Sequence, residues 1–243
     1  MPEKALRGFR RRMQIIFQDP YSSLNPRKTV YKIVSEPLEI HDLQDGGSDR
    51  TERVQETLEL VDLIPPENFV LKYPHELSGG QRQRVAVART LILKPDFIVA
   101  DEPVSMVDVS MRVGILNLLQ DLRNKFDLAF LFITHDIGIA RYISDRIGVM
   151  YLGKIVEIGE TESLIRDPLH PYTTALMSAA PKVFEERSAR TTLKGEVPNP
   201  IDVPPGCRFN PRCPQATEKC RTEEPQLFRT ESKRLVACHL AHN

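Results

Sequence analysis

The chain has 243 residues, and this length predicts one main domain with a buried core and an appendage. Its 33 basic and 33 acidic residues balance, so no global field attracts nucleic acid or an anionic membrane. No apolar run approaches the roughly 20 residues of a membrane-spanning helix, and no signal-peptide pattern opens the chain. We therefore expect a cytoplasmic protein, either free or held at a membrane by a partner.

The first stretch combines a basic segment with a short apolar run. Four arginines lie within residues 7–12, where they form either a solvated helix face or a phosphate-binding face. The apolar run Met13–Phe17 leads to Gln18 and then to a segment rich in turn-forming residues. Helical patterns follow at Val30–Ile40 and Thr51–Leu63.

The central stretch, Leu77–Pro103, begins with a Ser-Gly-Gly turn that runs into a helix pattern. Ser78 is a predicted N-cap, and Gly79 and Gly80 leave backbone N–H groups open to approach. The positive end of a helix dipole favours phosphate there, although such a turn can also be purely structural.

The helix pattern is followed by an apolar run that ends in two carboxylates. Phe97–Ala100 predicts a strand buried on both faces, and Asp101 and Glu102 follow it directly. An apolar strand that ends in Asp is the Walker B pattern, in which the Asp holds the Mg²⁺ of a nucleotide. The adjacent Glu is placed to polarise a water molecule. The alternative is a carboxylate that only caps a helix.

Strand and helix patterns alternate after this point, which predicts a mainly parallel sheet. A strand is expected at Leu128–Thr134, a helix at Ile137–Ser144, and two strands around a turn within Arg146–Gly159. The helix expected at Ser110–Lys125 has one apolar face, predicted to be core. This face comprises Met111, Ile115, Leu118, Leu119 and Leu122.

The order LSGGQ, helix, apolar strand and Asp-Glu resembles the signature motif and Walker B of ABC-type ATPases. Gln18 matches the family's Q-loop glutamine, and His135 matches its H-loop histidine. Ser105–Asp108 is similar to its D-loop, although the middle residues depart from the usual SALD. The resemblance implies an α/β fold, with a P-loop-type ABC ATPase core and an α-helical subdomain.

The resemblance also implies roles for these residues. Glu102 would be the general base, Asp101 would bind Mg²⁺, Gln18 would sense the metal and the attacking water, and His135 would contact the γ-phosphate. In the family two ATPase subunits pair head to tail around ATP. Ser78, Gly79 and Gly80 would face the partner's ATP, and Gln81 and Asp108 are further residues expected to bind the nucleotide.

The phosphate loop GxxxxGK[ST] is the missing motif. The near match Gly148–Ile155 has Ile in place of the hydroxyl residue and precedes a predicted strand, so we reject it. Only 17 residues precede Gln18, whereas the family's loop lies several tens of residues before its Q-loop. We therefore expect an N-terminally truncated core that is inactive by itself.

The tail holds all four cysteines: Cys207, Cys213, Cys220 and Cys238. Clustered cysteines in a cytosolic protein favour metal binding over disulfides, but the CxxC pairs typical of structural zinc are absent. Their spacing resembles the tail of peptide-importer ATPases, which implies a [4Fe–4S] cluster with four thiolate ligands. Zinc, a disulfide and unliganded thiols remain alternatives.

The resemblance as a whole predicts four parts. These are a core remnant (1–18), a helical subdomain with the signature motif (19–90), the α/β core (91–160) and a C-terminal extension with the small Cys-rich tail (161–243). The implied function is that of the ATP-binding subunit of an ABC importer for dipeptides or oligopeptides, at the cytoplasmic face of the membrane.

The implied partners are a second ATPase subunit (identical or different), membrane-spanning permease subunits and, indirectly, an extracytoplasmic solute-binding protein. Two alternatives remain. One is an ABC-type ATPase of nucleic-acid maintenance, although no insertion suited to nucleic acid is visible and we expect no nucleic-acid partner. The other is an iron–sulfur-binding remnant without ATPase activity.

Overall fold

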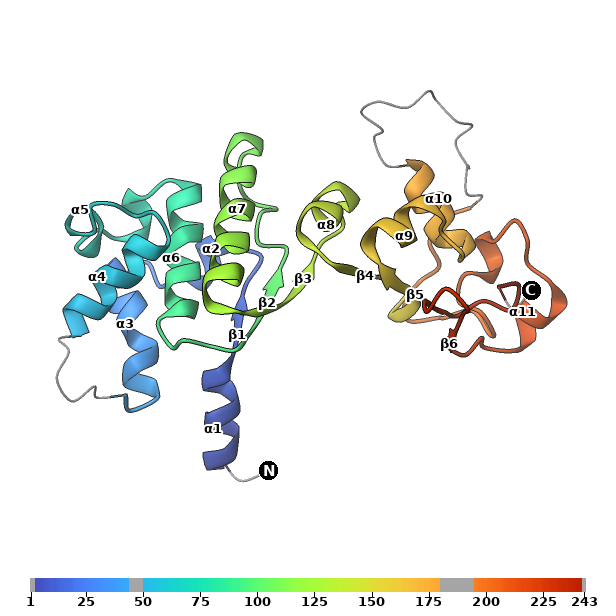
Figure 1. The fold of residues 1–243 in the computed structure, drawn as a ribbon, viewed down its shortest axis with the longest axis horizontal. Coiled ribbons are helices and arrows are strands. Elements are labelled where there is room, and N and C mark those ends of the chain that lie inside the picture. The colour runs from blue at the N-terminus through green and yellow to red at the C-terminus, as the bar shows by residue number, and fades with distance from the viewer. Residues whose placement is uncertain (1–2, 44–49, 180–194, 242–243) are drawn as a thin grey trace. The chain divides into compact units, whose positions relative to one another are not determined.

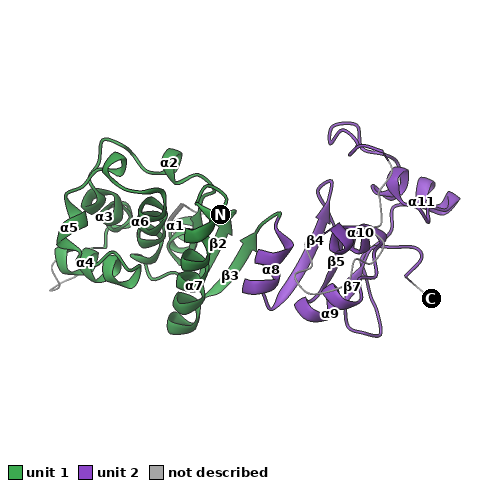
Figure 2. Cartoon of the chain, turned by 90° about the horizontal axis from the view of Figure 1, so that it is seen from above, with its two compact units in different colours: residues 1–135 green, residues 136–243 purple. Residues whose placement is uncertain are grey.

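The computed structural model describes residues 3–43, 50–179 and 195–241. The chain divides into two compact units, residues 1–135 (unit 1) and residues 136–243 (unit 2), and each is described by itself (Figure 2). The division falls directly after His135. The four-part boundaries expected from the sequence stay a prediction.

Unit 1 is built on a parallel sheet of β1 (Met13–Ile16), β2 (Phe97–Asp101) and β3 (Ala129–Ile133), with β2 in the centre (Figure 1). In the pairing register Ile16 lies opposite Ala100, and Ala100 lies opposite Phe132. All three strands therefore end at one edge of the sheet. The predicted strands and their parallel order are confirmed.

Two helices connect these strands in chain order. The helix α6 (Gly79–Leu91) precedes β2 and packs against β1, and α7 (Val109–Phe126) joins β2 to β3 and packs against α6. The predicted core residues of α7 are buried, with the exception of Met111, which is 39% exposed. Met111 lies in the first turn over Gly80, where a Cβ atom would come within 2.7 Å of its Cε atom.

One face of the sheet is exposed. Side chains alternate along a strand, and Ile98 and Ala100 are fully buried on one face. On the other face Met13 is 51% exposed, Leu131 49% and Ile133 44%. The strand Phe97–Ala100, predicted to be buried on both faces, is fully buried only on the face of Ile98 and Ala100, whereas Phe97 and Val99 on the other face are half-buried.

The segment between β1 and α6 is helical. It contains α2 (Pro20–Ser23), α3 (Val30–Ile40), α4 (Arg50–Leu60), α5 (Glu67–Val70) and the 3₁₀ turn η1 (Pro74–Glu76). Both longer helices were predicted. Their buried side chains, among them Val34 and Leu58, form a core with Val85 of α6. At the start of the chain, α1 (Glu3–Arg12) presents its arginines to solvent, as expected for a solvated face.

Unit 2 begins with α8 (Ile137–Ile143) and the antiparallel hairpin of β4 (Arg146–Tyr151) and β5 (Lys154–Glu160). The sheet order is β4-β5-β7-β6, so the tail strands β6 (Phe228–Arg229) and β7 (Leu235–Val236) extend the hairpin. The other elements of the unit are α9 (Thr161–Arg166), α10 (Pro171–Ala179), the 3₁₀ turn η2 (Asn210–Arg212) and α11 (Glu218–Thr222).

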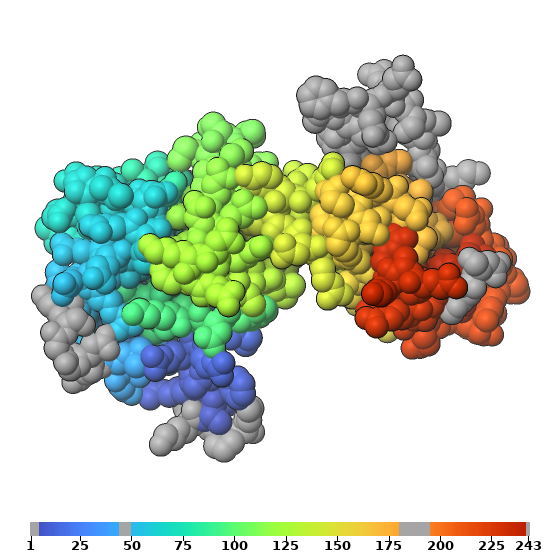
Figure 3. Space-filling view, viewed as in Figure 1, coloured from blue at the N-terminus to red at the C-terminus, as the bar shows by residue number. Residues whose placement is uncertain are grey.

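The tail shares one core with the hairpin. Phe209 is 1% exposed, and its ring meets Tyr151 edge-on, with 5.2 Å between the centroids. Tyr172 and Leu164 belong to the same cluster. The space-filling view shows the orange-to-red tail packed against the gold α9 and α10 (Figure 3). The tail therefore has no need of a separate hydrophobic core.

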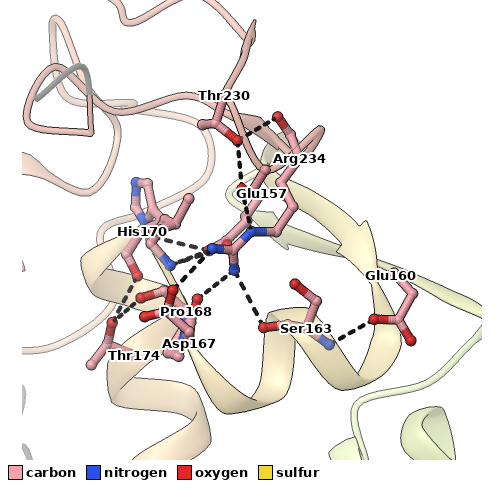
Figure 4. A network of polar contacts seen from close by, with 11 residues as sticks. Glu157, Glu160, Ser163, Asp167, Pro168, His170, Thr174, Thr230 and Arg234 are labelled. Atoms are coloured by element: carbon pink, nitrogen blue, oxygen red, sulfur yellow. Dashed lines mark hydrogen bonds and ion pairs between the residues drawn. The ribbon is translucent and has the colours of Figure 1, made fainter.

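A buried polar network fixes the end of the tail to the rest of unit 2 (Figure 4). Glu157 is fully buried, Arg234 is 4% exposed, and their closest charged atoms are 3.6 Å apart. The Glu157 carboxylate also accepts hydrogen bonds from the backbone N–H groups of Leu169 and His170. Arg234 donates to the carbonyl groups of Ser163 and Asp167 at the end of α9. The network thus joins β5, β7, α9 and the segment before α10.

Candidate functional site

Three of the predicted site residues meet at the edge where the strands of unit 1 end. Gln18 Nε2 donates to Glu102 Oε2 at 2.8 Å, and His135 Nδ1 lies 2.8 Å from Glu102 Oε1. Each residue follows a different strand, and the parallel register places the three strand ends side by side. The structure therefore brings Gln18, Glu102 and His135 into one polar cluster.

The backbone of Glu102 is held on both sides. Its φ angle is +41°, in the left-handed region that non-glycine residues rarely adopt. Its N–H donates to the carbonyl of Ile133 at 2.9 Å, and its own carbonyl accepts from the N–H and the Oγ of Ser105. Strained backbone conformations of this kind persist where several surrounding contacts hold them in place, which is often the case at functional sites. The D-loop segment and β3 thus fix the position of the carboxylate.

Asp101 and Asp108 lie before and after Glu102 in the sequence. Asp101 is the last residue of β2 and is half-buried. In the described part of the chain its carboxylate has no hydrogen bond or ion pair. Asp108 is the exposed N-cap residue of α7, and its side chain makes no capping hydrogen bond. Both carboxylates are therefore open to other partners.

The signature residues form a second group at the start of α6. Ser78 Oγ accepts from Gln81 N at 3.3 Å, and Gln81 Oε1 accepts from Ser78 N at 3.0 Å. This capping box confirms Ser78 as the N-cap and gives Gln81 a structural part that the sequence analysis missed. The S-x-x-Q spacing was the signal for it. Gly79 is half-buried and Gly80 is buried beneath Met111.

The four cysteines gather in unit 2 as free thiols. Cys220 and Cys238 are buried, and Cys207 N–H donates to the carbonyl of Cys220 at 2.8 Å. Burial raises the pKa of Cys207 and of Cys213, and neighbouring cysteines raise both further. However, the described residues contain no group of three or more His, Cys, Asp or Glu side chains arranged to hold a metal ion. The cysteines are neighbours without forming a preformed metal site.

The rejected phosphate-loop match lies on the β4–β5 hairpin. Gly148 is within β4, Gly153 occupies the turn with φ +76°, and Lys154 starts β5. A phosphate loop opens a helix, so this segment cannot serve as one.

Two family patterns match the chain. Residues 1–105 match the family described as "ABC transporter", and residues 156–220 match "Oligopeptide/dipeptide transporter, C-terminal region". The YkfD protein of Bacillus subtilis (strain 168), whose name assigns it to oligopeptide transport, is 51% identical over all of this chain and 74% of its own length. The chain belongs to the ATP-binding proteins of oligopeptide and dipeptide ABC transporters. The dipeptide transport ATP-binding protein DppF of Haemophilus influenzae is 49% identical over 97% of this chain and 71% of its own.

Solved structures agree with this assignment at the level of the fold. A dimeric post-hydrolysis state of the ATP-binding cassette MJ0796, bound to ADP and phosphate, has a TM-score of 0.57 and 31% identity. The match covers 66% of this chain and 68% of that one. This confirms the ABC ATPase fold expected from the motifs. In the described residues, no helix has the length and apolarity to cross a membrane.

Proposed function

We propose that this protein is the ATP-binding subunit of an ABC importer for dipeptides or oligopeptides and works at the cytoplasmic face of the membrane. Family membership supports this proposal, and the convergence of Gln18, Glu102 and His135 is the observation that carries it. The transported solute itself is not chosen by these residues.

Glu102 is the general base in this proposal. Its two carboxylate oxygens each accept one hydrogen bond, from Gln18 and from His135, which aims the carboxylate and leaves lone pairs for a water proton. Since the amide nitrogen of Gln18 points to Glu102, its carbonyl oxygen is available to the metal or the attacking water. The other ring nitrogen of His135, Nε2, is the atom that would contact the γ-phosphate in this proposal.

Asp101 fits the role of Mg²⁺ ligand. Mg²⁺ prefers oxygen donors and is commonly held by one or two carboxylates together with substrate phosphates. The oxygen atoms of Asp101 and Gln18 at this sheet edge supply suitable donors. Asp101 and Gln18 would hold Mg²⁺ there, and the ion would supply positive charge that offsets the negative charge of the phosphate groups.

The general-base role is tested in a chimera that joins a GxxxxGK[ST]-bearing strand–helix segment of a family member to this chain. Glu102→Gln keeps the size and hydrogen bonds of the side chain but removes the base, so we expect turnover to be lost while ATP binding is retained. Asp96→Asn, a change of an exposed carboxylate just before β2, is the control. Hydrolysis by the Glu102→Gln variant within about threefold of the parent would assign the base to another group.

The chain as printed holds no GxxxxGK[ST] sequence. The backbone donors and the lysine of that loop supply much of the binding and transition-state stabilisation of ATP. We therefore propose that this chain alone binds ATP weakly and hydrolyses it negligibly. Micromolar ATP binding in calorimetry would contradict this.

The signature residues act, in this proposal, on the ATP of a second ATPase subunit. Ser78–Gln81 and Asp108 lie at the N-terminal ends of α6 and α7, where the helix dipole favours phosphate. The dimeric form of the solved cassette supports such a pairing. The further partners are the permease subunits and, through them, a solute-binding protein.

The four cysteines carry a separate proposal, a structural [4Fe–4S] cluster in the tail. Four thiols in one unit are a suitable donor set, and the hydrogen bond from the Cys207 N–H to the Cys220 carbonyl brings two of their segments together. The geometry of the described side chains does not form a ready site, so ligation requires the side chains to reorient. Anaerobic purification with iron and zinc analysis is the test. Zinc without iron, or neither metal, would remove the cluster from the proposal.

A further inference from the structure

The single turn α2, which follows Gln18, rests on the helix that carries the signature motif. Two arginines of α6, seven residues apart and so on one face of the helix, make the contacts. Arg82 and Arg89 are both half-buried there. Neither side chain is among the site residues described above.

Arg82 holds Tyr21, the second residue of α2. Its guanidinium lies 4.2 Å from the centre of the Tyr21 ring, and its Nε donates to the carbonyl of Pro74 at 2.6 Å. A guanidinium over an aromatic ring within about 6 Å forms a cation–π contact. The Tyr21 hydroxyl also reaches the signature motif, because a Cβ atom at Gly79 would lie 3.6 Å from it.

Arg89 holds the other end of α2. Its Nη1 donates to the carbonyl of Ser23 at 2.7 Å. This carbonyl is among the last of the short helix, where backbone acceptors lack helical partners. Burial lowers the pKa of Arg89, and Glu36 opposes the shift.

The start of α2 is fixed to Gln18. Asp19 is the N-cap of α2 and accepts from the N–H of Tyr21 at 2.7 Å, and Gln18 is the residue directly before it. Gln18 in turn bonds Glu102. One connected series of contacts therefore runs from Glu102 through Gln18 and α2 to the first turn of α6.

We infer that Tyr21, Arg82 and Arg89 are positioning residues that clamp the Gln18 loop to the signature helix, so that the two ATP-facing elements shift together. The inference rests on the proposed roles of Gln18 and Ser78–Gly80. The clamp mechanically links Gln18, which acts on the ATP of its own subunit, to Ser78–Gly80, which act on the ATP of the partner subunit. Arg84 lies on the same helix and is a suitable control, because it donates hydrogen bonds to the carbonyl of Val61 and the carboxylate of Asp62 and not to α2.

The clamp is tested in the full chain without nucleotide, by amide hydrogen exchange resolved residue by residue. Tyr21→Leu removes the ring, and we expect about two- to fivefold faster exchange at Gln81 and Arg82, the range that an exposed cation–π contact gives. Tyr21→Phe keeps the ring and should restore slow exchange. Arg82→Ala should accelerate exchange within residues 21–24, whereas Arg84→Ala should not. Unchanged exchange at Gln81 and Arg82 in Tyr21→Leu would overturn the clamp.

The functional arm uses an importer complex that contains the phosphate-loop chimera of this chain described above. Because the clamp positions groups for the reaction without touching the phosphates, Tyr21→Leu should lower kcat with KM for ATP within about twofold. Tyr21→Phe should restore kcat. Equal kcat in all three proteins would refute the positioning role. A parent complex without ATPase activity would instead refute the proposed function, and the exchange experiment would still decide the clamp.

Discussion

The buried Glu157–Arg234 pair allows a comparison of two carboxylates that face one guanidinium. Glu157 is fully buried with its closest contact to Arg234 at 3.6 Å, while the Asp167 side chain is 79% exposed and lies 3.2 Å from Arg234 Nη2. The perturbations are Glu157→Gln and Asp167→Asn, which remove one negative charge each at nearly constant volume.

The expected magnitudes differ because of burial. Breaking a buried ion pair by removal of one partner costs about 3–5 kcal/mol, since the other charge stays buried. Arg234 keeps the carbonyl groups of Ser163 and Asp167, so we expect about 2–4 kcal/mol for Glu157→Gln. The exposed Asp167 contributes about 0–1 kcal/mol. For a unit of this size, the larger loss lowers Tm by roughly 10 °C or more.

Near-ultraviolet circular dichroism is a suitable assay. The chain has no tryptophan, and in unit 2 Tyr151 and Tyr172 pack on Phe209, so their signal reports the core that the network supports. Calorimetry on the same samples separates the transitions of the two units, which need not unfold together. Equal Tm losses for both variants, or a loss under about 2 °C for Glu157→Gln, would refute the reasoning from burial.

Two further predictions concern unit 2. Burial lowers the pKa of His170 to about 4 from its usual 6.5. As pH falls, this histidine is therefore protonated in the unfolded chain before it is protonated in the folded chain. Stability is therefore fully present above about pH 6.5 and should fall by roughly 2–3 kcal/mol toward pH 4, a dependence that His170→Asn should flatten in pH-dependent melting. Gly206 has φ +69°, and a Cβ atom there would lie 2.5 Å from the carbonyl oxygen of Cys220. Gly206→Ala should thus destabilise the cysteine segment by more than the roughly 1–2 kcal/mol of left-handed strain. The control Gly195→Ala, at φ +73° with no atom within 4 Å, should cost the strain alone, and equal effects would contradict the close approach.

The local elements could be predicted from the sequence because their signals lie within a few residues. Ser-Gly-Gly before an apolar periodic run predicted the capped helix α6, and the run Phe97–Ala100 before Asp101 predicted the strand β2. The central place of β2 in the parallel sheet came only from the structure. The motif order also identified the ABC ATPase family, which the relatives confirm. The hydrogen bond from the Ser78 N–H to the Gln81 side chain could also be predicted from the S-x-x-Q spacing, but our sequence analysis did not predict it.

Contacts between residues far apart along the chain could not be predicted from the sequence and are set by the tertiary structure. Gln18, Glu102 and His135 are far apart along the chain, and only the register of three parallel strands sets their contacts at 2.8 Å. The exposure of one face of the sheet could not be predicted either, because the sequence pattern of an apolar strand is the same whether one face or both faces are covered. In the tail, the sequence supplied four cysteines and a segment too short for its own core. The tertiary structure supplied the core by pairing β7 with β5 and by burying Arg234 against Glu157, contacts between residues nearly 80 positions apart that no local pattern encodes.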